Sequence, residues 1–202
     1  MANTRYIVLS KRPYQESALL LSGLSADYGK LDLVAHGAQK IGAKSMPVAD
    51  LYRELEVEFE ISPKSELGNL RSAELVTDFA ALADLKNNFI FAGKAANFIL
   101  KNTAAQDALP FTYDVLRAVL SQLASKDEKA WPLLQCAVIL KLTYLYENGL
   151  LPESEDVAQS DFFEQLIGTG IENSELPNYP GSYYQALHDW LNKLIDYHQL
   201  SR

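Results

Sequence analysis

The residues best suited to chemistry are basic side chains concentrated near the start of the chain, with tyrosines among them. Lysine and arginine neutralise nucleic-acid phosphates and aromatic rings stack on bases, so this combination suits sequence-independent binding of a single strand. Tyr14 and Tyr28 fall in the same predicted loops as the cations. The alternative is that the charges are solvated loop residues and that Tyr14 packs on Pro13. The candidate contacts to DNA are Lys11, Arg12, Lys30, Lys40, Lys44 and Arg71.

Catalysis of covalent chemistry has no comparable set of residues here. The sequence contains no phosphate-binding glycine loop, no nucleophile elbow and no pair of histidines at metal-ligand spacing. We expect Gly168-Thr169-Gly170 to be an ordinary loop, because no predicted strand leads into it. Cys136 fits an inert core thiol, and His188 and His198 fit packing or surface positions. We therefore expect no enzymatic activity, no metal and no cofactor.

The charge of the chain is distributed unevenly. Its 202 residues carry a net charge of −8, yet residues 1–50 hold six basic residues against four acidic ones. A locally basic start on an acidic remainder favours weak binding to a polyanion. The chain contains no apolar run near the ~20 residues of a membrane span and no signal-peptide pattern at its start, so we expect a cytoplasmic protein.

Residues 1–78 are expected to form a barrel of five strands. Residues 51–61 alternate, with Leu55, Val57 and Phe59 on one face and glutamates on the other, which is typical of a half-buried strand. Gly29 supplies the positive φ of a tight turn between two strands, and a basic corner at Lys11-Arg12-Pro13 is expected to end the first strand. Five strands in this length fit an OB-type barrel. The predicted strands are residues 6–9, 18–24, 31–35, 51–61 and 67–75.

Residues 79–202 change to helical spacing and are expected to form an all-helical domain, which makes the chain an α+β protein of two domains. Asn148-Gly149 followed by Pro152 is a helix C-terminal signal. The region between Gly168 and Ser182, rich in glycine and proline, is expected to be loop. The predicted helices are residues 79–102, 112–123, 128–147, 161–167 and 183–200.

The sequence resembles the RecO family, the bacterial recombination mediators of the RecFOR pathway. Arg12-Pro13-Tyr14-Gln15-Glu16-Ser17 and Leu19-Leu20-Leu21 resemble the family's opening motif. Further along, Gly29-Lys30-Leu31 and Val34-Ala35-His36-Gly37-Ala38 match its next segment, and Leu70-Arg71-Ser72-Ala73-Glu74-Leu75 is similar to a third. The resemblance covers roughly the first 80 residues well and the remainder only by pattern.

Membership in this family would imply binding of single-stranded DNA through the barrel, contact with RecR, and help in loading RecA or annealing strands. It would also imply a helical-domain groove for the acidic, phenylalanine-ended tail of the single-stranded-DNA-binding protein. Such a groove needs an apolar pocket rimmed by a cation. Arg117 and Lys141 are the cations centrally placed on the two middle helices, and the alternative is that each is a solvated helix charge.

The sequence also departs from the family pattern. His36 and Gln39 stand where the family has Lys and Arg, and the zinc cysteines that many members carry are missing. Glu54, Glu56, Glu58 and Glu60 are expected to make one barrel face too acidic to bind DNA. A protein-interaction adaptor of the same fold that has lost DNA binding is therefore the alternative to a DNA-binding mediator, and an uncharacterised hydrolase or transferase is a third, least supported class.

Overall fold

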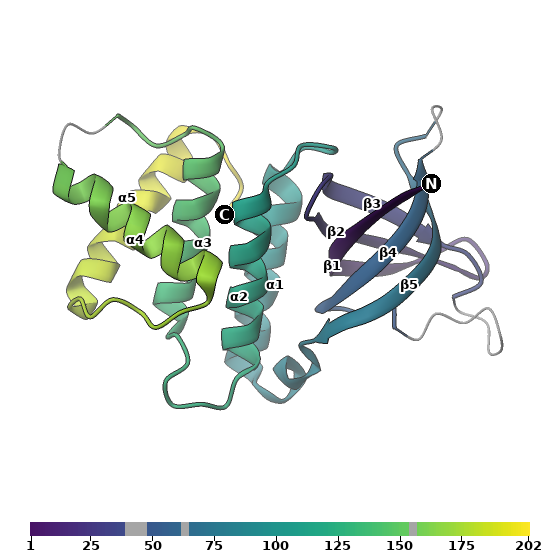
Figure 1. Ribbon diagram of the computed structural model, residues 1–202, viewed down its shortest axis with the longest axis horizontal. Coiled ribbons are helices and arrows are strands. Elements are labelled where there is room, and N and C mark those ends of the chain that lie inside the picture. The colour runs from purple at the N-terminus through teal and green to yellow at the C-terminus, as the bar shows by residue number, and fades with distance from the viewer. Residues whose placement is uncertain (39–47, 62–64, 154–156) are drawn as a thin grey trace.

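A closed barrel of five strands is followed by a bundle of helices in the computed structural model, which describes residues 1–38, 48–61, 65–153 and 157–202 (Figure 1). The order of strands around the barrel is β1-β2-β3-β5-β4, and β4 returns to pair with β1. All neighbours are antiparallel except β3 and β5. The expected OB-type barrel followed by helices is confirmed. The strands are β1 (Ala2–Tyr14), β2 (Ala18–Ser25), β3 (Gly29–Ala35), β4 (Arg53–Ile61) and β5 (Gly68–Asp78).

The alternating pattern of β4 places Leu55, Val57 and Phe59 in the barrel interior, where all three are fully buried. The corner expected at Lys11-Arg12-Pro13 was wrong, because β1 continues through these residues to Tyr14. Beyond Ile7, β1 pairs with β2 alone, and an edge position tolerates the missing N–H of proline. The chain reverses at Gln15 instead, which has φ +54°.

Six helical segments form the other half of the molecule. In Figure 1, α1 and α2 lie between the barrel and the remaining helices. The predicted first helix is split into a short 3-10 turn and α1, and α3 begins after Pro132 rather than at Glu128. The segments are η1 (Ala80–Asp84), α1 (Lys86–Asn102), α2 (Pro110–Ala124), α3 (Leu133–Glu147), α4 (Val157–Glu172) and α5 (Gly181–Tyr197).

The loop expected at Gly168-Thr169-Gly170 was wrong, because these residues lie inside α4. A Cβ on Gly170 would lie 2.6 Å from a methyl of Ile139 and 2.8 Å from one of Val115. The glycine therefore allows α4 to pack closely on α2 and α3 and does not serve a turn. The hydroxyl of Thr169 donates to the carbonyl of Gln165 one turn earlier, which lets a polar residue sit in the helix.

The barrel and the helices share one apolar core. Ile7, Leu9, Leu24 and Tyr52 of the barrel pack in the same cluster as buried side chains of α1, α2 and α3. The turn at Gly29, with φ +62° as expected, lies so close to the α1–α2 connection that an added Cβ would be 1.9 Å from the carbonyl oxygen of Asp107. The two halves therefore meet in a tightly packed junction.

Glu54 lies in this junction with no exposed surface. Its Oε1 accepts a hydrogen bond of 3.0 Å from the Tyr113 hydroxyl of α2, and its Oε2 accepts one of 2.8 Å from Thr77 of β5. A guanidinium nitrogen of Arg5 lies 3.8 Å away. The expectation that Glu54 belongs to the acidic side of β4 was therefore wrong, because α2 covers the beginning of this strand.

We expect Tyr113→Phe to destabilise the protein by about 1.5–3 kcal/mol, because it removes a hydrogen bond to a buried carboxylate. Urea unfolding at neutral pH measures this change. Tyr146→Phe, at a tyrosine that is 47% exposed, is the matched control and should change stability by less than ~0.5 kcal/mol. An equally small effect for Tyr113→Phe would show that the hydrogen bond between Tyr113 and Glu54 does not stabilise the folded protein.

The same contact predicts a pH dependence. Burial, and then the charge of Glu54, raises the pKa of Tyr113 above its ordinary value of ~10. The neutral hydroxyl of Tyr113 is favoured only in the folded state. It therefore contributes fully to stability below pH ~10, and this contribution is lost as the pH rises further. Above pH 10, the free energy of unfolding should therefore fall steeply with pH in the unaltered protein and less steeply in Tyr113→Phe. Identical slopes for the two proteins would contradict a raised pKa of Tyr113.

Candidate nucleic-acid interface and cation-rimmed pocket

The outward surface of β1, β2 and β3, here named the outer face, has an apolar centre. Arg12 pairs with Leu20 and Leu20 with Val34, and directly opposed residues of antiparallel strands share a face. Leu20 and Val34 form a small buried cluster with Ala18, against which Tyr14 packs. The outer face thus presents the half-buried Tyr14 and the exposed Arg12 around an apolar centre whose own side chains are buried.

Arg12 and Lys30 are the two predicted DNA contacts that the structure brings to the outer face. Lys30 is half-buried and pairs with Leu24, which packs in the core shared with the helices. It lies on the same side of β3 as Val34, four residues or about 13 Å further along. Within the described residues, neither Arg12 nor Lys30 takes part in a salt bridge. Between them, the Ser22 hydroxyl donates to Asp32, which adds one negative charge to the face.

The other predicted DNA contacts are placed differently. Lys11 lies on the inward side of β1 with Leu21 as its partner, and its ammonium is 2.5 Å from Asp50. Burial alone would raise the pKa of Asp50, but the hydrogen bond from Lys11 and the one from the Leu51 N–H lower it overall. Arg71 is bonded to Glu60 at 2.6 Å. Lys40 and Lys44 lie outside the described residues.

Two further residues of the predicted interface have structural roles. Tyr28 meets Phe59 edge to face at 5.4 Å and packs on the barrel interior. His36 faces Asn69 of β5, with its Nε2 3.2 Å from the side-chain oxygen. Tyr14 therefore remains the tyrosine on the outer face, and His36 extends this face toward β5.

A pocket of about 410 Å³ lies among α1, α3 and α5. Apolar side chains of α1 and α3 line one part, among them Phe91, Phe98 and Leu140. The other part carries basic groups, of which only Lys141 was predicted from the sequence as a partner contact. The basic lining residues are Lys94, Lys141, His188 and Arg202.

Lys141 is held in place at this pocket. Its ammonium donates to the Asn192 side-chain oxygen at 2.6 Å and lies 3.4 Å from Nε2 of His188. Burial, followed by the positive charge of Arg202, lowers the pKa of Lys141 from its ordinary value. Asp196, which pairs with Arg202, partly offsets this because its negative charge raises the pKa of Lys141. The pocket therefore favours an anionic group, because a bound carboxylate would relieve the crowding of cations.

Arg117, the second predicted partner contact, is not part of this pocket. Its guanidinium lies 4.0 Å from Asp114 on its own helix, and its Nε is buried with no hydrogen-bond partner among the described residues. Sequence reasoning missed Lys94, His188 and Arg202. Lys94 had a signal, since it falls at helical spacing with Phe91 and Phe98, whereas nothing in the sequence connects the C-terminal Arg202 with α3.

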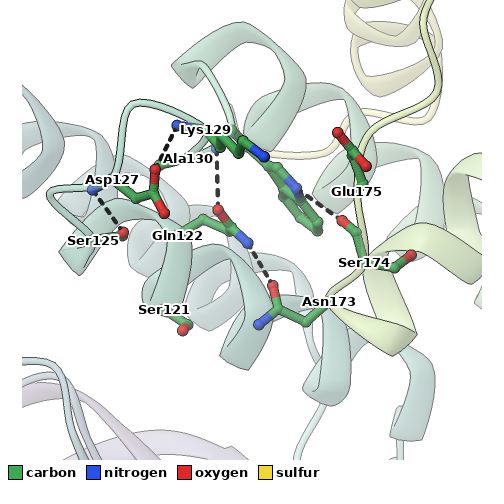
Figure 2. Close-up of a pocket in the computed structure, with 10 residues that line it drawn as sticks. Ser121, Gln122, Ser125, Asp127, Lys129, Ala130, Asn173, Ser174 and Glu175 are labelled. Carbon is green, nitrogen blue, oxygen red and sulfur yellow. Dashed lines mark hydrogen bonds between the residues drawn. The ribbon is translucent and has the colours of Figure 1, made fainter.

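A second hollow, of about 330 Å³, is lined mainly by polar residues that bond to one another (Figure 2). Gln122 of α2 donates to Asn173 at 2.8 Å and accepts from the backbone N–H of Trp131 at 3.1 Å. The Trp131 indole donates to the carbonyl of Ser174 at 3.1 Å. These bonds join the ends of α2 and α4 to the α2–α3 connection, which is a structural role.

Residues able to hold a metal do not gather in the described parts of the chain. Burial raises the pKa of Cys136 to about 12, so its thiol stays protonated and unreactive at neutral pH. No helix in the described ranges is long and apolar enough to cross a membrane.

The pocket yields a prediction for His188. Burial first, and the charge of Lys141 second, lower the pKa of His188 below its ordinary value of ~6.5. Lys141→Met should therefore raise the His188 pKa, which an NMR titration of its ring resonances measures. Lys126→Met, at an exposed lysine outside the pocket, is the matched control and should have no effect. An unchanged His188 titration in Lys141→Met would show that the two groups do not interact.

Known proteins resemble this chain along much of its length. Residues 1–79 match the family model described as Recombination protein O N terminal. The DNA repair protein RecO of Polynucleobacter necessarius subsp. necessarius (strain STIR1) is 27% identical over 178 residues, 88% of this chain and 66% of that protein. RecO of Mesoplasma florum is 27% identical over 59% of this chain and 45% of its own length. RecO of Burkholderia pseudomallei is 32% identical over 58% of this chain and 41% of its own length. The chain thus spans about two fifths to two thirds of these relatives. The barrel thus matches the model of the RecO N-terminal domain, and the chain is similar to DNA repair proteins named RecO.

Proposed function

We propose that the chain is a DNA-repair mediator that binds single-stranded DNA on the outer face of its barrel and a partner protein in the Lys141 pocket. Its action is binding and exchange of partners, without bond chemistry. The observation that carries the proposal is the presence, on one chain similar to RecO proteins, of an OB barrel and of an apolar pocket rimmed by cations. Each fits one of the two ligands a mediator must hold.

DNA binding would use stacking together with counterion release. Tyr14 of the outer face suits bases, and Arg12 and Lys30 suit phosphates. Two cations about 13 Å or more apart can reach phosphates of the same strand, because successive phosphates repeat at intervals of several ångströms. The affinity should be low, because Lys11 and Arg71 are already engaged by Asp50 and Glu60.

Partner binding would use the Lys141 pocket for an acidic peptide that ends in an aromatic residue. The apolar side made by Phe91, Phe98 and Leu140 suits the aromatic ring, and the ammonium of Lys141 suits the terminal carboxylate. The tail of the single-stranded-DNA-binding protein has this chemistry. Through this tail the chain would reach coated DNA even though the outer face binds DNA weakly. In the cytoplasm it would then act with RecR in loading RecA or annealing strands.

A protein-interaction adaptor without DNA binding is the second candidate. The carboxylates that engage Lys11 and Arg71 favour it, as does the surplus of acidic residues after residue 50. The two candidates share the Lys141 pocket and differ only in the outer face, so a DNA-binding experiment separates them.

We expect single-stranded DNA to bind weakly and with strong dependence on salt. Each phosphate contact contributes about −0.7 to the slope of log affinity against log salt. Arg12→Ala with Lys30→Ala should therefore make the slope less steep by about 1.4, as measured by fluorescence anisotropy of a labelled oligothymidine. The matched control is Lys126→Ala with Lys129→Ala, two exposed lysines of the α2–α3 connection. Absence of binding even at low salt would favour the adaptor. An unchanged salt slope in the double variant would exclude the outer face as the DNA-binding site.

The pocket is tested with an acidic peptide that ends in phenylalanine with a free carboxylate. Lys141→Met should weaken its binding about 10-fold or more, because a charge-assisted hydrogen bond contributes ~1.5–3 kcal/mol. Isothermal titration calorimetry measures the change, and Lys126→Met is the control. The same peptide with an amidated C-terminus should bind the unaltered protein as weakly as the free peptide binds Lys141→Met. Equal binding of both peptides to the unaltered protein would contradict carboxylate recognition.

A further inference from the structure

A group of aromatic rings lies at the surface between α4 and α5, on a different part of the bundle from the Lys141 pocket. Phe162 and Tyr183 meet at 4.9 Å, and Phe163 and Trp190 meet at 5.6 Å. These four rings line a pocket of about 170 Å³, here named the aromatic pocket. At ~30 Å³ for each water molecule, it has room for about five waters or one small polar group.

The rings of the aromatic pocket differ in exposure in a way that leaves ring surface open. Phe162 is buried and forms the base, whereas Tyr183 is 48% exposed. Tyr179, 39% exposed, stacks on Tyr183 at 5.7 Å and extends the aromatic surface beyond the pocket. Aromatic faces carry negative electrostatic potential, so several rings around one small space attract a cation.

The charge around the aromatic pocket points to the same kind of ligand. Residues 142–192 contain no lysine or arginine and nine aspartates and glutamates. Asp161 and Glu164 adjoin Phe162 and Phe163 in the sequence, Asp189 adjoins Trp190, and all three acidic residues are exposed. Lys193, the first lysine after this stretch, does not line the pocket. None of these charged residues lines the pocket itself, but the surplus of acidic residues in the segments that form it favours a basic ligand.

We infer that the aromatic pocket is a docking site for an arginine side chain on a basic segment of a partner protein. The planar guanidinium stacks on aromatic rings and is more weakly hydrated than an ammonium, so it loses less on entering an apolar space. The inference does not rest on the proposed function, because it uses neither the outer face nor the Lys141 pocket.

The test uses a short peptide with one arginine between glycines, and a second peptide with citrulline, a neutral isostere, in its place. In NMR spectra of the nitrogen-15-labelled chain, the Trp190 indole resonance should shift with the arginine peptide until it saturates. The Trp131 indole, bonded to Ser174, is an internal control and should not move. The citrulline peptide should bind roughly 2- to 30-fold more weakly, the range expected for a cation on aromatic rings.

Variants test which residues form the site. Tyr183→Leu keeps an apolar contact with Phe162 but removes one ring, so it should weaken binding of the arginine peptide. Tyr197→Leu is the matched control, at a ring that is 79% exposed and outside the pocket, and should leave this binding unchanged. Asp161→Asn with Glu164→Gln should reduce the salt dependence of binding. Equal binding of the two peptides, no shift of Trp190, or a shift caused only by a proline-rich peptide would each overturn the inference.

Discussion

The buried carboxylate of Glu54 constrains how the barrel and the helices can be arranged. Removing a carboxylate from water costs several kcal/mol unless hydrogen bonds and opposite charge replace its hydration. Here the replacements come from Tyr113 on α2, Thr77 on β5 and Arg5 on β1. Because these groups belong to three elements, the carboxylate is satisfied only when α2 lies against this end of the barrel. Around it, apolar side chains of both halves form one core.

This junction fixes the two candidate binding regions relative to each other. Helix α1 packs on the barrel through the shared core, and the same helix contributes Phe91, Lys94 and Phe98 to the Lys141 pocket. The outer face belongs to β1, β2 and β3, of which β1 and β2 also pack on that core through Ile7, Leu9 and Leu24. A DNA strand on the barrel and a peptide in the bundle would therefore be held at a set separation, which suits a protein that brings two ligands together.

The sequence was sufficient to predict the fold where the information is local. The alternation of β4, the glycine of the β2–β3 turn and the change to helical spacing after Asp78 each depend on neighbouring residues. It was insufficient where distant segments meet. Period-two alternation assigned Glu54 to the solvent side, since no local feature indicates that α2 covers it. Gly170 was predicted to be a loop residue. A glycine is needed there because α4 packs closely on Val115 and Ile139, and these residues belong to two other helices that a local pattern does not reveal. Arg202 joins Lys141 in one pocket only through the path of α5.

The central claim is that the barrel and the helical bundle fold as one cooperative unit around the Glu54 junction. Differential scanning calorimetry of the whole chain tests it most directly. We expect a single transition in which the calorimetric enthalpy equals the van't Hoff enthalpy, because neither half can lose the shared core alone. Two separate transitions, or a calorimetric enthalpy well above the van't Hoff value, would show that the halves unfold independently and would contradict the claim.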